Sequence, residues 1–336
     1  MVGLCIASGC GCGGLREGGG DPAALGIHHG ELLPACAYSF DEQRQPYLLP
    51  RVVAADWGEA IKLGDPLGTM CPEDAVTIGR DGSVLYFYWS PAVEADPAEL
   101  LRDTTGTYRA ERKEGDPGRF GPPRFFELRR GARDGACDGR LSFTPSGDRV
   151  YFHSTRQENT GYQMSPPRED PLDIYVAEIV QGVPGAAVRL PEPINSPYLD
   201  GEHCLSPDGS RLYLSSTRPG GPGGIDLWVS TLQGSVWSDP VPMPPPINSA
   251  AADLQPAFAA DDPHTLYFVS DRGGPGSIFR SRYDSAGGAW SEPEMVITGY
   301  VGEPSLVADG SLMYFVHVLV DDDGVFGSDI WYVQRR

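Results

Sequence analysis

The sequence contains five copies of one short motif, an apolar–Tyr–apolar triplet that follows a tight turn by a few residues. The triplets are Leu85-Tyr86-Phe87, Val150-Tyr151-Phe152, Leu212-Tyr213-Leu214, Leu266-Tyr267-Phe268 and Met313-Tyr314-Phe315. The turns are Asp81-Gly82, Ser146-Gly147, Asp208-Gly209, Asp261-Asp262 and Asp309-Gly310. Asp-Gly between apolar runs is typical of a β-hairpin, because glycine tolerates the positive φ that such turns need. The repeat therefore predicts five similar hairpins.

Each copy continues with a third strand, and several copies add a fourth strand that opens with Trp-Ser-acid-Pro, as at Trp237 and Trp290. Successive turns lie roughly 50 to 65 residues apart, which is the period expected of four-stranded propeller blades. The last copy stops after its third strand, while a spare fourth-strand signature begins at Trp57 and runs to Leu63. We therefore expect an all-β, five-bladed β-propeller with four antiparallel strands per blade, whose last blade is closed by an N-terminal strand.

The N-terminal residues differ from the repeats. The stretch "IASGC" places small residues before Cys10, as in a bacterial lipobox, although the basic and apolar parts of a full signal are missing. We expect residues 1–45 to be a truncated signal or lipobox region with a linker, and residues 46–336 to be the propeller. A Gly/Cys-rich tail without a targeting role is the alternative. If Cys10 is acylated, the protein is exported to the periplasm or displayed as an outer-membrane or cell-surface lipoprotein.

Cysteine content and charge limit the partners. In an exported chain the remaining cysteines could form disulfides, with Cys36–Cys71 and Cys137–Cys204 as the favoured pairs, although spacing does not fix the pairing. The net charge of −20 argues against nucleic acid or an anionic membrane surface as a partner. Contact with a membrane is therefore expected only through a lipid anchor.

The segment "SPDGSRLYLSSTRPGGPGGIDLWVS" with the later "WSDPVPMPPPIN" resembles the TolB-like, WD-repeat-like β-propeller family of exported bacterial proteins. The resemblance covers roughly residues 50–336 and is strongest in the third and fourth copies. It implies a periplasmic or surface-associated propeller that serves as a platform for binding proteins. The function we expect is a cell-envelope scaffold that binds a protein or glycan ligand without catalysis. The best-known member of that family has six blades and a further N-terminal domain, so its particular partners do not carry over. The glycines of "RPGGPGG" precede a strand rather than a helix, so they predict a turn and no phosphate-binding cofactor site.

Aligning the repeats brings acidic residues to the start of each innermost strand, at one mouth of the central channel. The first aligned position holds Glu73, Asp138, Asp200, Asp253 and Val301. Two residues further along stand Ala75, Arg140, Glu202, Gln255 and Glu303. We expect the ligand site at this mouth, from Glu73, Asp74, Asp138, Asp200, Glu202, His203, Asp253 and Glu303. One interpretation is a carboxylate ring that binds Ca²⁺ or a basic group of a ligand. The other is that each carboxylate caps its own loop.

Two further patterns bear on chemistry. A Ser-x-Arg motif recurs after the second strand and ends at Arg156, Arg218 and Arg272, and its repetition predicts structural pairing of each arginine with an acid or a carbonyl. No nucleophile or metalloprotease motif is present. The alternative function is a carboxylate-dependent glycoside hydrolase of the five-bladed arabinanase type, for which Asp74, Asp138, Asp200 and Glu202 are the candidate acids.

Overall fold

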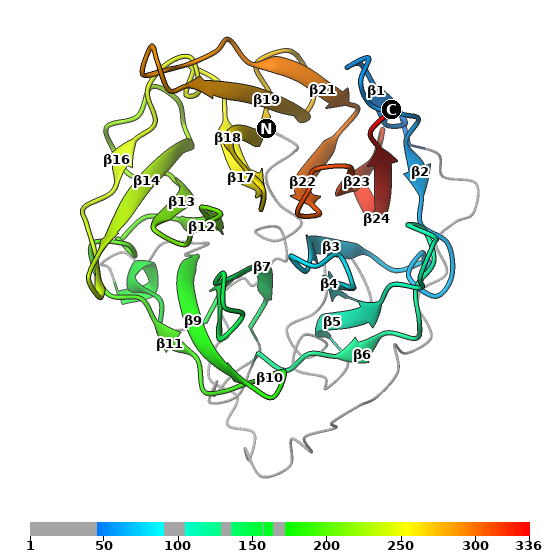
Figure 1. Ribbon diagram of the computed structural model, residues 1–336, viewed down its shortest axis with the longest axis horizontal. Helices are drawn as coiled ribbons and strands as arrows, with labels where there is room; N and C mark the ends of the chain where they lie inside the picture. The colour runs from blue at the N-terminus through cyan, green and yellow to red at the C-terminus, as the bar shows by residue number, and fades with distance from the viewer. Residues whose placement is uncertain (1–45, 91–104, 129–135, 157, 164–171) are drawn as a thin grey trace.

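The computed structural model describes residues 46–90, 105–128, 136–156, 158–163 and 172–336. These residues form five antiparallel sheets around a central axis, so the fold is the expected five-bladed β-propeller (Figure 1). Blade one contains β3 (Glu73–Ile78), β4 (Val84–Trp89), β5 (Gly106–Glu111) and β6 (Arg124–Phe125). Blade two contains β7 (Asp138–Phe143), β8 (Arg149–Ser154), β9 (Asp173–Val180), β10 (Val183–Pro184) and β11 (Val188–Arg189). Blade three contains β12 (Asp200–Leu205), β13 (Arg211–Ser216), β14 (Asp226–Gln233), β15 (Val236–Trp237) and β16 (Val241–Pro242).

Blades four and five are completed by strands from the beginning of the propeller. Blade four contains β17 (Asp253–Ala259), β18 (Asp262–Ser270), β19 (Ser277–Asp284), β20 (Ala289–Trp290), β21 (Glu294–Thr298) and β1 (Arg51–Val52). Blade five contains β22 (Val301–Leu306), β23 (Leu312–Asp321), β24 (Gly324–Gln334) and β2 (Ile61–Lys62). Residues Thr160–Gln163 form a short 3-10 turn. None of the described residues forms a helix long and apolar enough to cross a membrane.

The expected ring closure is confirmed. Ile61 pairs with Tyr332 and Lys62 with Trp331, both antiparallel, and Trp57 forms a further bridge to Arg335. The strand β1 was not expected: it pairs with β21 and gives blade four an additional outer strand. The segment from β1 to β2 therefore joins blades four and five as well as closing the last sheet.

The turns form where the motif predicted them, and Asp208-Gly209 shows why. Gly209 has a φ of +73°, a backbone conformation that side chains with a Cβ rarely adopt. Asp208 accepts hydrogen bonds from the Ser206 hydroxyl at 2.5 Å and the Ser210 N–H at 3.0 Å. These hydrogen bonds lower the pKa of Asp208 to about 2. The aspartate thus stays ionised and holds the hairpin closed.

The apolar–Tyr–apolar triplets build the core between blades. Alternation along a strand puts the two outer residues on one face of the sheet and the tyrosine on the other. In β8, Val150 and Phe152 are fully buried on one side, while Tyr151 contacts Trp237 of blade three edge-on. Both faces of each blade are thus covered by neighbouring blades, which explains why the strand cores are apolar on both sides.

One of the two favoured disulfides is wrong. Cys137 and Cys204 are both thiols. Cys137 directly precedes β7, where the Tyr88 hydroxyl lies 3.3 Å from its sulfur, whereas Cys204 is the penultimate residue of β12. The two residues therefore lie at opposite ends of their inner strands, on different blades. Cys71 is disulfide-bonded, and Cys36 and Cys10 lie outside the described residues.

Candidate functional site

The acids at the start of the inner strands bind the protein itself. Asp200 accepts hydrogen bonds from the Ser196 N–H at 2.6 Å and the Ser216 hydroxyl at 2.6 Å, and it pairs with Arg218 at 2.6 Å. Burial raises the pKa of Asp200, and the Arg218 charge opposes that rise. The repeated motif therefore produces a clamp, in which one aspartate joins the preceding loop to the arginine of Ser-x-Arg.

The same aspartate–arginine pair recurs in blades two and four with small changes. Asp253 accepts the Ser249 N–H at 2.6 Å and pairs with Arg272 at 2.5 Å. In blade two, Asp138 lies 3.5 Å from Arg156. The predicted pairing of these arginines with acids is thus confirmed.

Glu73 occupies the same position in blade one and differs in its contacts. One of its carboxylate oxygens accepts hydrogen bonds from the N–H and the hydroxyl of Thr69, while the other is buried without a hydrogen-bond partner. Burial raises the pKa of Glu73 well above its ordinary value. For Asp200, Asp253 and Glu73 the loop-capping interpretation describes the contacts in the structure.

A second ring of residues lies two positions further along the inner strands, and it has an unusual backbone. Each inner strand carries a β-bulge at this point, where its register with the neighbouring strand shifts. The bulged residues all have positive φ between +42° and +54°: Ala75, Arg140, Glu202, Gln255 and Glu303. Positive φ is uncommon for residues other than glycine. Its recurrence in every blade shows that the bulge is a feature of the fold, and bulges commonly re-aim a side chain.

Side chains of the bulged residues connect neighbouring blades. The side-chain amide oxygen of Gln255 accepts the Glu303 N–H at 2.9 Å, and the Glu303 carboxylate accepts the Val76 N–H at 3.0 Å. Arg140 donates to the Pro256 carbonyl at 2.7 Å and to the Pro304 carbonyl at 3.4 Å. Contacts between blades two, four, five and one thus converge on the propeller axis.

Three carboxylates, Asp74, Glu202 and Glu303, form what we call the axial acid cluster. All three are buried, with at most 4% of each residue exposed. Burial raises the pKa of Asp74 to about 7, with a further rise from the charge of Glu202. Burial also raises the pKa of Glu202 to about 6, against the opposing charge of Arg140. Burial raises the pKa of Glu303 well above its ordinary value, and the charges of Asp74 and Glu202 add to the rise. The cluster therefore holds protons at a pH at which exposed carboxyl groups have lost theirs.

His203 lies next to this cluster in the chain and is fully buried, and neither ring nitrogen has a hydrogen-bond partner. Burial lowers its pKa to about 3, so the imidazole is neutral at physiological pH. The equivalent positions in the other blades hold Val76, Leu141, Pro256 and Pro304. The imidazole of His203 thus stands where the other blades have apolar side chains.

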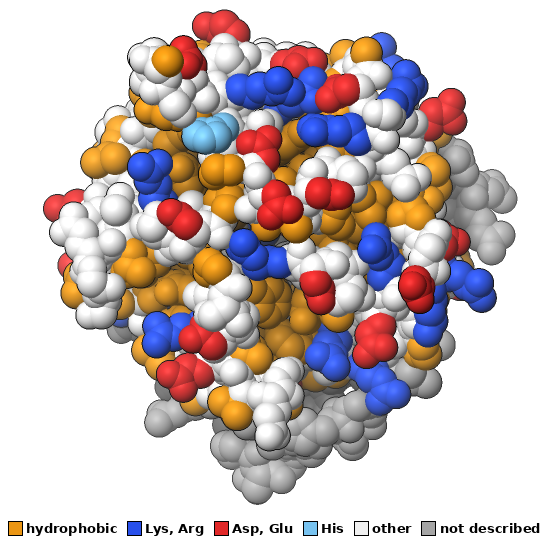
Figure 2. Space-filling view, in the orientation of Figure 1, with side chains coloured by type: hydrophobic (Ala, Val, Ile, Leu, Met, Phe, Trp, Pro, Cys, Tyr) orange, Lys and Arg blue, Asp and Glu red, His pale blue; other side chains and the backbone are white. Residues whose placement is uncertain are grey.

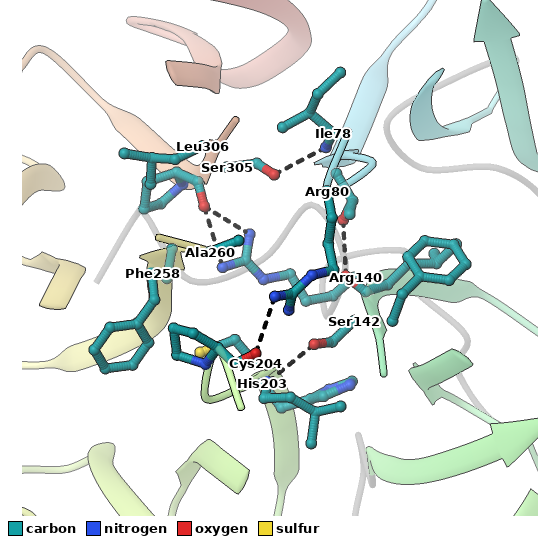
Figure 3. Close-up of a pocket in the computed structure, with 17 residues that line it drawn as sticks. Ile78, Arg80, Arg140, Ser142, His203, Cys204, Phe258, Ala260, Ser305 and Leu306 are labelled. Atoms are coloured by element: carbon teal, nitrogen blue, oxygen red, sulfur yellow. Dashed lines mark hydrogen bonds between the residues drawn. The ribbon is translucent and has the colours of Figure 1, made fainter. Parts of the chain in front are cut away.

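Beyond the bulges, at the end of the inner strands where the turns lie, the axis opens into a cavity of about 90 Å³, which we call the axial pocket (Figure 3). Arg80 and Arg140 reach into it, and His203, Ser142 and Ser305 are among its other lining residues. Arg80 donates to the Pro207 carbonyl at 2.9 Å. No Asp or Glu is among the described residues that line this pocket.

The lining of the axial pocket offers mainly donors. Ser142 accepts the Leu205 N–H at 2.9 Å, and Ser305 accepts the Ile78 N–H at 2.9 Å, so each hydroxyl keeps its own proton to donate. Each guanidinium carries five N–H donors, more than its carbonyl partners use. Such a site can hold a small anionic group, because guanidinium and hydroxyl donors match carboxylate or phosphate oxygens.

The expected site is therefore divided. Glu73, Asp138, Asp200 and Asp253 begin their inner strands, Asp74, Glu202 and Glu303 are the second or third residues of theirs, and His203 lines the axial pocket. Sequence reasoning missed Arg80 and Arg140 as pocket residues, although Arg140 was visible as the one base among the aligned bulge positions.

Within the described residues, no group of three or more His, Cys, Asp or Glu side chains could hold a metal ion. The surface seen along the axis carries charges of both signs: Figure 2 shows acidic and basic side chains interspersed there.

Comparisons with known proteins agree on the fold. No protein-family model matches the chain, and no curated protein matches it. Among solved structures, the chain is similar to a thermostable family-43 glycoside hydrolase, with 13% identity over 81% of this chain and 92% of that chain, at a TM-score of 0.53. It is also similar to a second glycoside hydrolase, with 10% identity over 87% and 92% of the two chains and a TM-score of 0.52. A protein described as TolB from Agrobacterium tumefaciens is 16% identical over 80% and 91% of the chains, with a TM-score of 0.43. At these identities the similarity to the glycoside hydrolases shows a shared propeller fold.

Proposed function

We propose that the protein is a non-catalytic binding scaffold of the cell envelope, whose axial pocket receives an anionic group of a protein or glycan ligand. The observation that supports this most is the convergence of Arg80, Arg140, Ser142 and Ser305 as donors around one small cavity. The acids that a hydrolase could use at the strand starts are largely occupied by clamps, as at Asp200 and Asp253.

The anion site is tested with inorganic phosphate as the probe, by titration calorimetry at constant ionic strength. We expect phosphate to bind the wild type and to bind Arg80→Gln at least about tenfold more weakly, because one charge-assisted contact is worth roughly 1.5–3 kcal/mol. Arg51→Gln, which removes an exposed arginine of β1, is the matched control and should bind as the wild type does. Equal affinity in Arg80→Gln and the wild type would refute the site.

A carboxylate-dependent glycoside hydrolase is the second candidate, and the axial acid cluster favours it. A hydrolase needs one protonated and one ionised carboxyl group, and the raised pKa values of Asp74, about 7, and Glu202, about 6, would allow such a pair near neutral pH. Release of reducing sugar from arabinan decides between the candidates. The scaffold proposal expects the same background from the wild type, Asp74→Asn and Glu202→Gln. Turnover by the wild type that drops at least a hundredfold in both variants would establish the hydrolase instead.

Export and lipid attachment at Cys10 belong to the same proposal. Disulfides persist mainly in oxidising compartments, and Cys71 is disulfide-bonded. Expression of the full chain behind a complete bacterial lipoprotein signal, followed by fractionation and mass spectrometry, is the test. We expect an acylated N-terminal Cys10 in the membrane fraction and a soluble periplasmic product from Cys10→Ser. An unmodified Cys10 in the wild type would remove the lipid anchor from the proposal.

A further inference from the structure

The fourth-strand tryptophans close the spaces between blades in a regular way. Between blades two and three, Trp237 meets Tyr151 edge-on, with ring centroids 6.2 Å apart. Between blades four and five, Trp57 meets Tyr267 in the same manner at 6.4 Å. Each pair joins the triplet tyrosine of one blade to the outer tryptophan of the next, so these two interfaces are filled by the same contact.

The interface between blades three and four has the same two residue types in a different arrangement. Tyr213 contacts Phe258 at 5.0 Å, and Trp290 contacts Tyr283 at 5.2 Å. Phe258 stands where blades three and five have Leu205 and Leu306, and its larger ring contacts the tyrosine, as Phe143 of blade two contacts Tyr86 of blade one. The tyrosine and the tryptophan thus belong to two separate aromatic pairs.

A groove of about 970 Å³ lies at this interface, lined by both aromatic pairs, and we call it the blade three–four groove. Its volume is that of a pocket for a ligand of several rings. Tyr283 is 37% exposed, and Trp290 and Phe258 are partly exposed, so ring faces are available to a ligand.

The polar lining of the groove carries both signs and many uncharged groups. Arg211 and His264 supply donors, Asp239 supplies acceptors, and Gln233 and Thr231 offer both. A strongly charged ligand would meet repulsion from one sign or the other, whereas a ligand rich in hydroxyl groups can bond to each. Aromatic faces beside hydrogen-bonding groups suit sugar rings, whose C–H faces stack on aromatic rings while their hydroxyls bond at the edge.

An extended peptide fits the groove less well. Peptides that bind propeller strands by strand addition need an unpaired sheet edge. The groove is lined by residues of β13, β14, β16, β17, β18, β19 and β20. β13, β14, β18 and β19 are paired on both sides within their sheets, whereas β16 and β20 are paired on one side only. Each of these two edge strands is two residues long, and Pro242 of β16 has no N–H to donate, so they offer little edge to an added strand. The innermost strand β17 is also at an edge, and there Phe258 contributes its side chain to the groove.

We propose that the blade three–four groove is a carbohydrate-binding site for an uncharged oligosaccharide of several units. It is separate from the proposed anion site, although Pro207, Phe258 and Ala260 line both cavities. Sugar rings lie against Tyr283 and Trp290, and hydroxyl groups bond to Arg211 and Asp239.

The test is titration calorimetry of the full chain with cellohexaose, xylohexaose, maltohexaose and chitohexaose. At least one of these probes is expected to bind with a Kd below 1 mM, on the order of the weakest specific sites. Tyr283→Ala and Trp290→Ala should each weaken that binding at least about tenfold, as the loss of one stacking platform implies. Tyr47→Ala, which removes another exposed tyrosine outside the groove, should bind as the wild type does.

Thermal melting first establishes that each variant folds. If Trp290→Ala does not fold, the binding test uses Tyr283→Ala alone. The proposal is overturned if none of the four hexasaccharides binds the wild type, or if binding is unchanged in the folded groove variants. A random dodecapeptide library that binds the wild type through Trp290, with no hexasaccharide binding, would also overturn it and assign the groove to peptides. An unchanged phosphate affinity in Arg80→Gln would refute the anion site without bearing on the binding of hexasaccharides, so the two proposals fail independently.

Discussion

At the scale of single residues, equivalent repeat positions carry different chemistry. The acids at the strand starts could be predicted from the sequence because the repeat aligns them. Whether a carboxylate faces a ligand or its own loop depends on contacts that sequence does not show, such as the pairing of Asp200 with Arg218, 18 residues away. The bulges were also invisible, because Ala75 or Glu202 carries no local signal for positive φ. The sequence therefore predicted that these acids begin the inner strands, but not which partners their carboxylates have.

The clamp predicts a large stability cost for removing its aspartate. Asp253→Ala removes the carboxylate that pairs with Arg272 and accepts the Ser249 N–H, and breaking a buried ion pair from one side costs about 3–5 kcal/mol. We expect this loss in the free energy of unfolding measured by urea titration. Asp239→Ala, at an exposed aspartate, should stay within about 0.5 kcal/mol of the wild type. A loss for Asp253→Ala as small as that control would show that the clamp does not stabilise the blade.

The axial acid cluster predicts a pH dependence of stability. The pKa of Asp74 is about 7 in the folded protein against 3.8 ordinarily, so the folded state keeps a proton that the unfolded chain releases. Its contribution is present below pH 3.8 and is lost as the pH rises to 7, by at most about 1.4 kcal/mol per pH unit. Glu202 and Glu303 act in the same direction, and the charge of Arg140 opposes the rise for all three carboxyls.

Comparison with Asp74→Asn isolates this contribution. Buried His153 and His203, whose pKa values are lowered by burial, oppose it below pH 6.5 in both proteins. The difference in unfolding free energy between wild type and variant, measured from pH 4.5 to 8, should therefore shift in favour of the variant up to about pH 7 and then level off. A difference independent of pH would mean that Asp74 is ionised throughout.

At the scale of elements, the strand order followed from the sequence more completely than the site did. The triplets and turns fixed the inner two strands of each blade, since hairpins depend on neighbouring residues. The closure of blade five could be predicted because Trp57 repeats a fourth-strand signature. β1 could not, because two residues that pair with Thr298 and Ile297 carry no motif of their own. Short strands are selected by the sheet edge they meet rather than by their own sequence.

The segment from β1 to β2 predicts that Trp57 stabilises the closed ring. Trp57 is fully buried, packs on Tyr267 of blade four, and has Arg335 of blade five 5.2 Å above its ring. Trp57→Ala should lower the free energy of unfolding by about 3–5 kcal/mol, as for other buried aromatic truncations. Val236→Ala, at a strand residue that is 65% exposed, is the control. A loss below about 1 kcal/mol in guanidinium titration would show that closure does not depend on this side chain.

At the scale of the whole molecule, the charge is strongly unbalanced, with 46 acidic and 26 basic residues. The donors of the axial pocket are thus found in a chain that repels anions at long range. The pocket could not be predicted from composition, because Arg80 and Arg140 meet only when the first and second blades close around the axis (Figure 3). A local excess of donors inside an acidic molecule would select a ligand by contact rather than by long-range attraction.

The charge imbalance also predicts how salt changes stability. Net charge far from zero destabilises the compact state through self-repulsion, and sodium chloride shortens the screening length from about 30 Å at 0.01 M to about 8 Å at 0.15 M. The melting temperature at pH 7 should therefore rise between these two concentrations. Salt weakens the attraction within the buried ion pairs much less, because pairs such as Asp200–Arg218 are out of reach of the screening ions. A melting temperature that falls with added chloride would mean that attraction among exposed charges, rather than net repulsion, dominates the folded surface.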